Sequence, residues 1–206
     1  PDAIIVGYTA GSEIMEGRIT DPAIIITPDS NDLGWSMWGS GSSFTGLYNE
    51  IIPFVEENYN VSAETEDRAF AGLSMGSMVA QSLINYDASQ FGYFGPWSGG
   101  ASVTASAPNL QHTHILFAGG RYDFGNPNAT TIDNNLRYTG ANYKYIEVAG
   151  AHDFNTWCQM FRIFCEDYLW NPDAFIKEGP TVVKDPESPT GYTAKFTYYA
   201  PDAKQV

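Results

Sequence analysis

The sequence predicts an α/β fold with a mostly parallel sheet flanked by helices. Short apolar segments alternate with stretches of helical periodicity through the centre of the chain, and this alternation is typical of such a sheet. The expected strands from residue 68 onward end in glycine or in a short polar stretch. In an open α/β sheet, the loops that bind ligands lie at these strand ends.

The first third of the chain contributes one strand, one loop and one helix to this prediction. Ala23–Thr27 is an almost continuous apolar run that stops at Pro28, which predicts a strand buried on both faces. Residues 31–43 are rich in Gly, Ser and Trp and predict a loop. Apolar residues then repeat at helical spacing over 47–58, where Pro53 predicts a kink.

The same two periodicities predict the rest of the α/β region. The expected strands are 68–73, 91–97, 113–118 and 143–148, and the expected helices are 77–86, 130–138 and 155–169. Strand 68–73 is indicated mainly by its neighbours, because Ala69 and Ala71 are poor strand formers.

The composition excludes two classes of partner. With 24 acidic and 10 basic residues, the chain carries a formal charge of 10 − 24 = −14, which rules out a nucleic-acid binder that relies on a basic face. No apolar run approaches the roughly 20 residues of a membrane-spanning helix. Hydrophobic residues make up 43% of the 206, enough for a core that buries roughly 70% of the unfolded surface. We therefore expect a globular domain without nucleic-acid or membrane partners.

The character of the chain changes after residue 172. Pro180, Pro186 and Pro189 follow in quick succession, and residues 192–198 then alternate with period two, as in a half-exposed antiparallel strand. A single strand cannot form a stable sheet by itself. The predicted division is therefore an α/β domain over 1–179, and a linker with the opening strand of a truncated all-β module over 180–206.

The segment Gly72-Leu73-Ser74-Met75-Gly76 fits Gly-x-Ser-x-Gly, the pattern of a nucleophile elbow. In such an elbow, the glycines allow a tight turn from strand to helix that exposes the serine hydroxyl. The pattern alone is a modest signal, and a glycine-rich turn with an exposed serine is the alternative. Its position between an expected strand and an expected helix favours the elbow.

A serine nucleophile needs a histidine base and an orienting carboxylate, which in these hydrolases follow in the order Ser, Asp/Glu, His. His152 lies in a loop directly after an expected strand, and Asp123 follows the expected strand 113–118. Asp153 adjoins the histidine and is the expected N-cap of the next helix. Three residue types in the required order, each just beyond a strand, favour a triad of Ser74, Asp123 and His152.

The other two histidines do not fit this pattern. His112 and His114 share one face of an expected strand start, where a solvated sheet edge is the favoured interpretation and a two-histidine metal site the alternative. Because no further ligands cluster with them, we expect neither a metal nor a cofactor.

Together with residues 120–124, and with residues 150–154 and Trp157, the motif around Ser74 resembles the esterase-D-like α/β-hydrolases. The greatest resemblance is to the feruloyl and acetyl-xylan esterases of carbohydrate esterase family one, over about residues 14–172. This resemblance implies a three-layer α/β-hydrolase fold that lacks its first strands at the N-terminus. Residues 191–206 resemble the start of an immunoglobulin-like module that accompanies such esterases.

The resemblance also implies a role for each site residue. Ser74 is the implied nucleophile, His152 the general base and then the general acid, and Asp123 the carboxylate that orients it. The backbone N–H of Met75 is the implied first donor of the oxyanion hole.

The second oxyanion donor departs from the family pattern. Relatives carry a His-Gly-Gly-like loop after an early strand, whereas this chain has no histidine before His112. Either Gly7–Gly11 replaces that loop, or the loop lies upstream of Pro1. Truncation is the favoured interpretation, because the strands expected before residue 20 are also missing.

The implied function is a secreted serine esterase that removes feruloyl or acetyl groups from xylan-like polysaccharide as part of a longer multidomain chain. Trp97 and Trp157 are expected to line an acyl pocket or a sugar-stacking surface, with core packing as the alternative for both. Two other functions compete with this one. They are a non-catalytic carbohydrate-binding or scaffold module that retained the fold, and acyl transfer or thioester hydrolysis.

Overall fold

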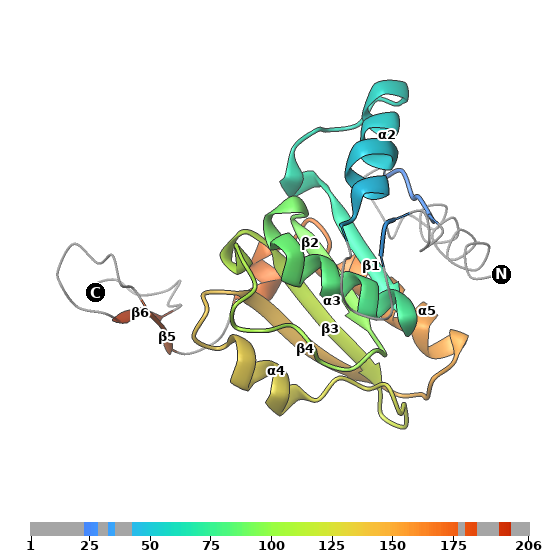
Figure 1. Cartoon of the computed structure of the whole chain (residues 1–206). Helices are drawn as coiled ribbons and strands as arrows, with labels where there is room; N and C mark the ends of the chain where they lie inside the picture. The colour runs from blue at the N-terminus through green and yellow to red at the C-terminus, as the bar shows by residue number, and fades with distance from the viewer. Residues whose placement is uncertain (1–22, 29–32, 36–42, 177–179, 185–193, 199–206) are drawn as a thin grey trace.

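A four-stranded parallel sheet forms the centre of the protein (Figure 1). The computed structural model describes residues 23–28, 33–35 and 43–176, and the backbone of 180–184 and 194–198. The strands pair in the order β1-β2-β3-β4, and every neighbouring pair is parallel. Their bounds are Ala69–Leu73, Tyr93–Trp97, His114–Gly120 and Asn142–Val148. The predicted α/β class and all four strands expected after residue 68 are confirmed.

Helices follow the strands in the predicted alternation. The α-helices are α2 (Ile52–Asn58), α3 (Met75–Asp87), α4 (Ala129–Leu136) and α5 (Phe154–Ile163). The π-helices are η1 (Leu47–Ile51) and η5 (Phe164–Tyr168), and the 3-10 helices are η2 (Thr65–Asp67), η3 (Ala88–Gln90), η4 (Leu110–His112) and η6 (Pro172–Phe175). None of the helices in the described ranges combines the length and apolar character that crossing a membrane requires.

Strand β3 shows why the domain has three layers. Ile115 and Phe117 belong to the hydrophobic cluster that contains α3 and α4, whereas Leu116 and Ala118 belong to the cluster that contains α5. Successive side chains of a strand point to opposite faces of the sheet. A strand covered by helices on both faces therefore reads as one continuous apolar run.

The irregularity predicted at Pro53 is present. Pro53 is the second residue of α2, but η1 runs directly into α2, so its missing N–H removes a hydrogen bond from the interior of a continuous helical segment. The preceding turn is the π-helix η1, so this helical segment is not a single regular α-helix.

The prediction of a buried strand at Ala23–Thr27 is wrong in this structure. Residues 23–28 have no regular secondary structure, and Ile24, Ile25 and Ile26 are between 40% and 47% exposed. Strand β1 lies at one edge of the four-stranded sheet, and no described segment pairs with residues 23–28. A continuous apolar run becomes a buried strand only where a neighbouring strand and a covering layer are both present.

The C-terminal region contributes a separate pair of strands. Strand β5 (Pro180–Lys184) pairs antiparallel with β6 (Ala194–Tyr198), so the predicted strand over 192–198 is present as β6. The partner strand β5 was not predicted. Division of the chain at residue 179 and an immunoglobulin-like module after it stay predictions.

Candidate active site

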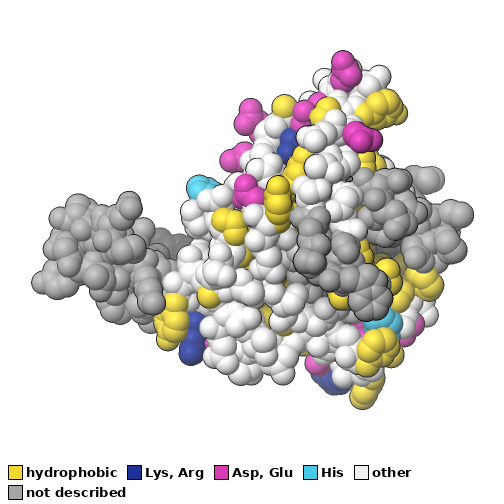
Figure 2. Space-filling model, viewed as in Figure 1, with side chains coloured by type: hydrophobic (Ala, Val, Ile, Leu, Met, Phe, Trp, Pro, Cys, Tyr) yellow, Lys and Arg dark blue, Asp and Glu magenta, His cyan; other side chains and the backbone are white. Residues whose placement is uncertain are grey.

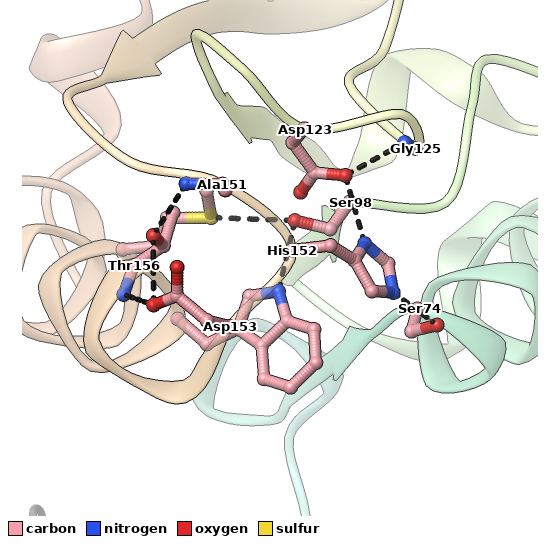
Figure 3. A network of polar contacts seen from close by, with 10 residues as sticks. Ser74, Ser98, Asp123, Gly125, Ala151, His152, Asp153 and Thr156 are labelled. Atoms are coloured by element: carbon pink, nitrogen blue, oxygen red, sulfur yellow. Dashed lines mark hydrogen bonds and ion pairs between the residues drawn. The ribbon is translucent and has the colours of Figure 1, made fainter.

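Each of the four parallel strands is followed by a polar side chain of the site. Ser74 comes directly after β1 and Ser98 directly after β2, whereas Asp123 and His152 lie in the loops after β3 and β4. Parallel strands all end at the same edge of a sheet. These side chains, spread over 78 positions, therefore meet at one place (Figure 3).

Ser74 forms the turn between β1 and α3. Its backbone has φ 52° and ψ −114°, a conformation that few non-glycine residues adopt. Its N–H donates to the carbonyl of Trp97 on β2 at 3.0 Å, which anchors the turn to the sheet. A Cβ on Gly72 would overlap the carbonyl of Gly76, so glycine is needed where α3 passes close to β1. The predicted strand, turn and helix around the serine are confirmed.

His152 bridges the other two predicted residues. Its Nε2 lies 2.9 Å from Ser74 Oγ, and its Nδ1 lies 2.7 Å from Asp123 Oδ1. Because an ionised carboxylate only accepts hydrogen bonds, the imidazole proton belongs on Nδ1. Nε2 then accepts the hydrogen bond from the serine hydroxyl. The structure thus brings together the three side chains that the sequence pattern singled out.

Asp123 is held as a buried acceptor. Its side chain has no exposed surface, and its Oδ1 also accepts the N–H of Gly125 at 2.6 Å. The other carboxyl oxygen, Oδ2, is buried without a hydrogen-bond partner among the described residues. Hydrogen bonds to an ionised carboxylate are stronger than those between neutral groups. This arrangement fixes the carboxylate that accepts the hydrogen bond of His152 Nδ1 and so orients the imidazole.

Thr156, a buried residue in the first turn of α5, holds the loop that carries His152. Its Oγ1 accepts the N–H of Ala151 at 3.0 Å, and its own N–H donates to Asp153 Oδ1 at 3.0 Å. The prediction that Asp153 caps this helix is confirmed. The hydrogen bond from the Thr156 N–H lowers the pKa of Asp153, so the cap is ionised at neutral pH.

Met75 is the first residue of α3, directly after Ser74. The first four N–H groups of an α-helix have no partner within the helix, and the helix dipole places partial positive charge there. This position suits an oxyanion donor, and that role stays a prediction. The segment Gly7–Gly11, one alternative for the second donor, lies outside the described residues.

The two predicted substrate-binding tryptophans lie in different environments. Trp157, on α5, is half-buried, and its ring is perpendicular to the His152 ring with centroids 5.0 Å apart. Trp97 is only 2% exposed and donates its indole N–H to the carbonyl of Leu116 at 3.2 Å. Trp97 is therefore a core residue, as the alternative prediction had it, because its ring has no free surface that a substrate could contact. Trp157 stays a candidate substrate-binding residue.

Exposed aromatic rings surround the histidine. Phe124 is 88% exposed and packs on the His152 ring with centroids 4.1 Å apart, and Phe154 is an edge-to-face neighbour of Trp157 at 5.0 Å. Tyr122 is also exposed. Figure 2 shows hydrophobic side chains beside a histidine at the lower right of the molecule. The exposed Phe124 and Phe154 rings are therefore a candidate binding surface beside the histidine.

Comparison with known proteins places this site in context. No protein-family model matches the chain. It is 30% identical over 160 residues to an endo-1,4-beta-xylanase/feruloyl esterase of Xylanibacter ruminicola, and the alignment covers 73% of this chain and 22% of that protein. It is 32% identical over 121 residues to Esterase Rv1288 of Mycobacterium tuberculosis, with coverage of 52% and 26%. The chain thus spans about a quarter of the length of these relatives.

The arrangement of the elements matches that of solved structures. The CE1 ferulic acid esterase AmCE1/Fae1A of Anaeromyces mucronatus, in complex with ferulic acid, superposes with a TM-score of 0.58 over 78% of this chain and 70% of that one, at 20% identity. The chain has an α/β-hydrolase fold. The S-formylglutathione hydrolase FrmB of Staphylococcus aureus gives a TM-score of 0.51 over 67% and 68%, at 18% identity. The predicted resemblance to esterase-D-like hydrolases and feruloyl esterases is confirmed.

Sequence reasoning missed three residues around Ser74, Asp123 and His152. Ser98 follows β2 directly, so the strand-end rule that selected Asp123 and His152 also points to it. Phe124 ends the segment 120–124 that carries the family resemblance, but no role was predicted for its ring. The contact of Thr156 with the histidine loop emerges only when α5 packs in place.

Proposed function

We propose that this chain is a serine esterase whose substrates are carboxylic esters, with feruloyl esters on plant cell-wall polysaccharide as the favoured class. The relay of Ser74, His152 and Asp123, with distances of 2.9 Å and 2.7 Å, carries the proposal. A serine hydroxyl is a poor nucleophile at neutral pH without an adjacent base. Hydrogen bonds at both ring nitrogens place the imidazole where it can act as that base.

The geometry suits a two-step acyl transfer. Ser74 Oγ attacks the ester carbonyl while His152 Nε2 takes its proton, and Asp123 stabilises the imidazolium. The N–H of Met75 donates to the oxygen of the tetrahedral intermediate, a type of contact that typically contributes 10²- to 10³-fold in turnover. His152 then gives the proton to the departing alcohol. Water enters by the same route and releases the acid from Ser74.

The rings around the site favour an aromatic acyl group. Phe124 and Trp157 both contact the His152 ring, and Phe154 adjoins Trp157. A feruloyl ring can pack against the exposed rings of Phe124 and Phe154, whereas an acetyl group would leave them without contact. The name of the Xylanibacter relative supports ester-bearing polysaccharide as the carrier. A secreted location and a longer multidomain chain belong to the same proposal.

Ser74→Ala tests the proposal directly. We expect the variant to lose methyl ferulate hydrolysis by at least about 10³-fold, because no other group supplies the nucleophile. Ser82→Ala is the matched control, since Ser82 lies on the same helix and takes no part in the relay. Equal rates for wild type and Ser74→Ala would leave only the non-catalytic alternative. Comparing methyl ferulate with acetylated xylan and a thioester then ranks the acyl and leaving groups.

A further inference from the structure

A second polar network lies beside His152, and no step of the proposed hydrolysis uses it. The hydroxyl of Ser98 accepts the indole N–H of Trp157 at 3.0 Å and lies 4.0 Å from the sulfur of Met160 (Figure 3). Ser98 follows β2, whereas Trp157 and Met160 belong to α5. The network therefore ties the edge of the sheet to the helix that follows the catalytic histidine.

Ser98 is held in one position by its surroundings. It is 1% exposed, has a left-handed φ of 55°, and donates its N–H to the carbonyl of Ala118 at 2.9 Å. A Cβ on Gly125 would overlap the Ser98 carbonyl, so the turn that carries Asp123 packs directly against it. Left-handed backbone at a residue other than glycine persists only where neighbouring structure imposes it. The Ser98 hydroxyl is thus a fixed acceptor.

Trp157 connects this acceptor to the imidazole. Its N–H is bound by Ser98, and its ring stands at 84° to the His152 ring. The hydrogen bonds to Ser74 and Asp123 fix the two ring nitrogens, but they leave the imidazole free to tilt about the line that joins them. Contacts with the ring itself restrict that tilt. Of the two aromatic neighbours among the described residues, Phe124 is largely exposed, whereas Trp157 is half-buried and anchored by its hydrogen bond to Ser98.

We infer that Ser98 and Trp157 are positioning residues for the base: their hydrogen bond holds the indole against His152 and keeps Nε2 directed at Ser74. This inference rests on the proposed function and deepens it. Neither residue exchanges a proton or forms a bond with the substrate in this scheme. It also differs from the expectation that Trp157 binds the acyl group. Loss of a positioning residue lowers kcat, whereas loss of an acyl-group contact raises KM.

The test uses two single variants and their combination. Ser98→Ala removes the acceptor and Trp157→Phe removes the donor, so each breaks the same hydrogen bond. We expect each to lower kcat for methyl ferulate about tenfold, with KM within about twofold, since a misplacement of about 1 Å can cost up to 10²-fold. The double variant is expected to be no slower than the slower single variant, because both changes remove one interaction.

A matched control exists on α3. Ser82 also accepts an indole N–H, from Trp35 at 3.2 Å, but it lies two turns beyond the nucleophile. Ser82→Ala is expected to keep the wild-type kcat even if its melting temperature falls. A second readout needs no turnover. Exchange of the His152 Nδ1 proton with solvent, followed by NMR, is expected to be faster in Ser98→Ala and unchanged in Ser82→Ala.

Two results would overturn the inference. Additive losses in the double variant would show that the two side chains act separately. A raised KM with unchanged kcat in Trp157→Phe would make the indole a substrate contact instead. If Ser98→Ala does not fold, as judged by circular dichroism, kcat and the exchange of the His152 Nδ1 proton are both measured on Trp157→Phe. Failure of the proposed function is distinct, because wild type and Ser74→Ala would then have equal rates while the Nδ1 exchange still reports on positioning.

Discussion

Gly72 and Gly76 flank Ser74 at equal distances in the sequence, but they differ in their surroundings. A Cβ on Gly72 would overlap backbone atoms of Gly76, whereas a Cβ on Gly76 would meet no atom within 4 Å. Gly76 also lies inside α3 and has no left-handed φ. The motif therefore contains one glycine that close packing requires and one that packing does not require.

Alanine substitutions at the two positions should differ in their effect on stability. Gly72→Ala is expected to lower the free energy of unfolding by about 2 kcal/mol or more, because α3 must move away from β1. Gly76→Ala is expected to be neutral or to stabilise by up to about 1 kcal/mol, because alanine is the better helix former. Urea unfolding of both variants measures the difference. Equal losses would show that the elbow needs both glycines for packing.

Among the elements, the start of β3 carries a half-buried histidine. The His114 ring stacks on Tyr93 of β2 with centroids 5.1 Å apart and contacts Phe175 of η6 at the same distance. Burial lowers the pKa of His114 below its usual 6.5, and a hydrogen bond to the carbonyl of Gly92 partly opposes this. The histidine is thus a packed residue of the sheet, and the solvated edge predicted for it is wrong.

This environment makes the stability of β3 depend on pH. The folded state binds a proton at His114 less readily than the unfolded state does. The stabilising effect of the neutral His114 ring is therefore complete above pH 6.5 and declines as pH falls toward the folded pKa. His114→Phe keeps an aromatic ring between Tyr93 and Phe175 and cannot be protonated. Its free energy of unfolding is therefore expected to fall less than that of wild type between pH 7.5 and 5.5.

Denaturant unfolding at the two pH values checks this expectation. His112→Gln is the control, because His112 is exposed and its loss should leave the wild-type pH dependence unchanged. An identical pH dependence in wild type and His114→Phe would assign the effect to other groups.

For the whole molecule, the dominant property is its negative charge. The formal charge is −14, and Figure 2 shows acidic side chains gathered at the end that carries α2. Such a field repels an acidic polymer and leaves a neutral one unaffected. Screening shortens its reach to about 10 Å at 0.1 M salt. The charge of this chain therefore disfavours an acidic carrier relative to a neutral one.

Salt should consequently act differently on two kinds of substrate. Hydrolysis of feruloyl esters on a uronic-acid polymer is expected to speed up when NaCl rises from about 0.01 M to 0.2 M, because repulsion is screened. Hydrolysis of methyl ferulate, which is neutral, is expected to stay constant and serves as the control. No salt effect on the acidic polymer would show that the charge lies too far from the site to matter.

Much of the fold and of the candidate site could be predicted before any coordinates. Strands β1 to β4 were predicted from short-range apolar patterns, which depend on residues close together in the chain. Ser74, Asp123 and His152 were selected because each follows such a strand, and parallel strands end at one edge. The bridging geometry of His152 follows from that shared edge. Sequence reasoning works here because a local pattern and a topological rule agree.

What the sequence by itself determined is the alternation of β1 to β4 with their helices, and which three side chains meet at the candidate site. The tertiary structure alone decided that Ile24–Ile26 lie exposed and that Trp97 is buried while Trp157 faces the imidazole. It also decided that Ser98 accepts the indole N–H of Trp157. These outcomes depend on which distant segments pack together. Burial and hydrogen bonding between residues such as 98 and 157 are set by the assembled layers, and no nearby residue encodes them.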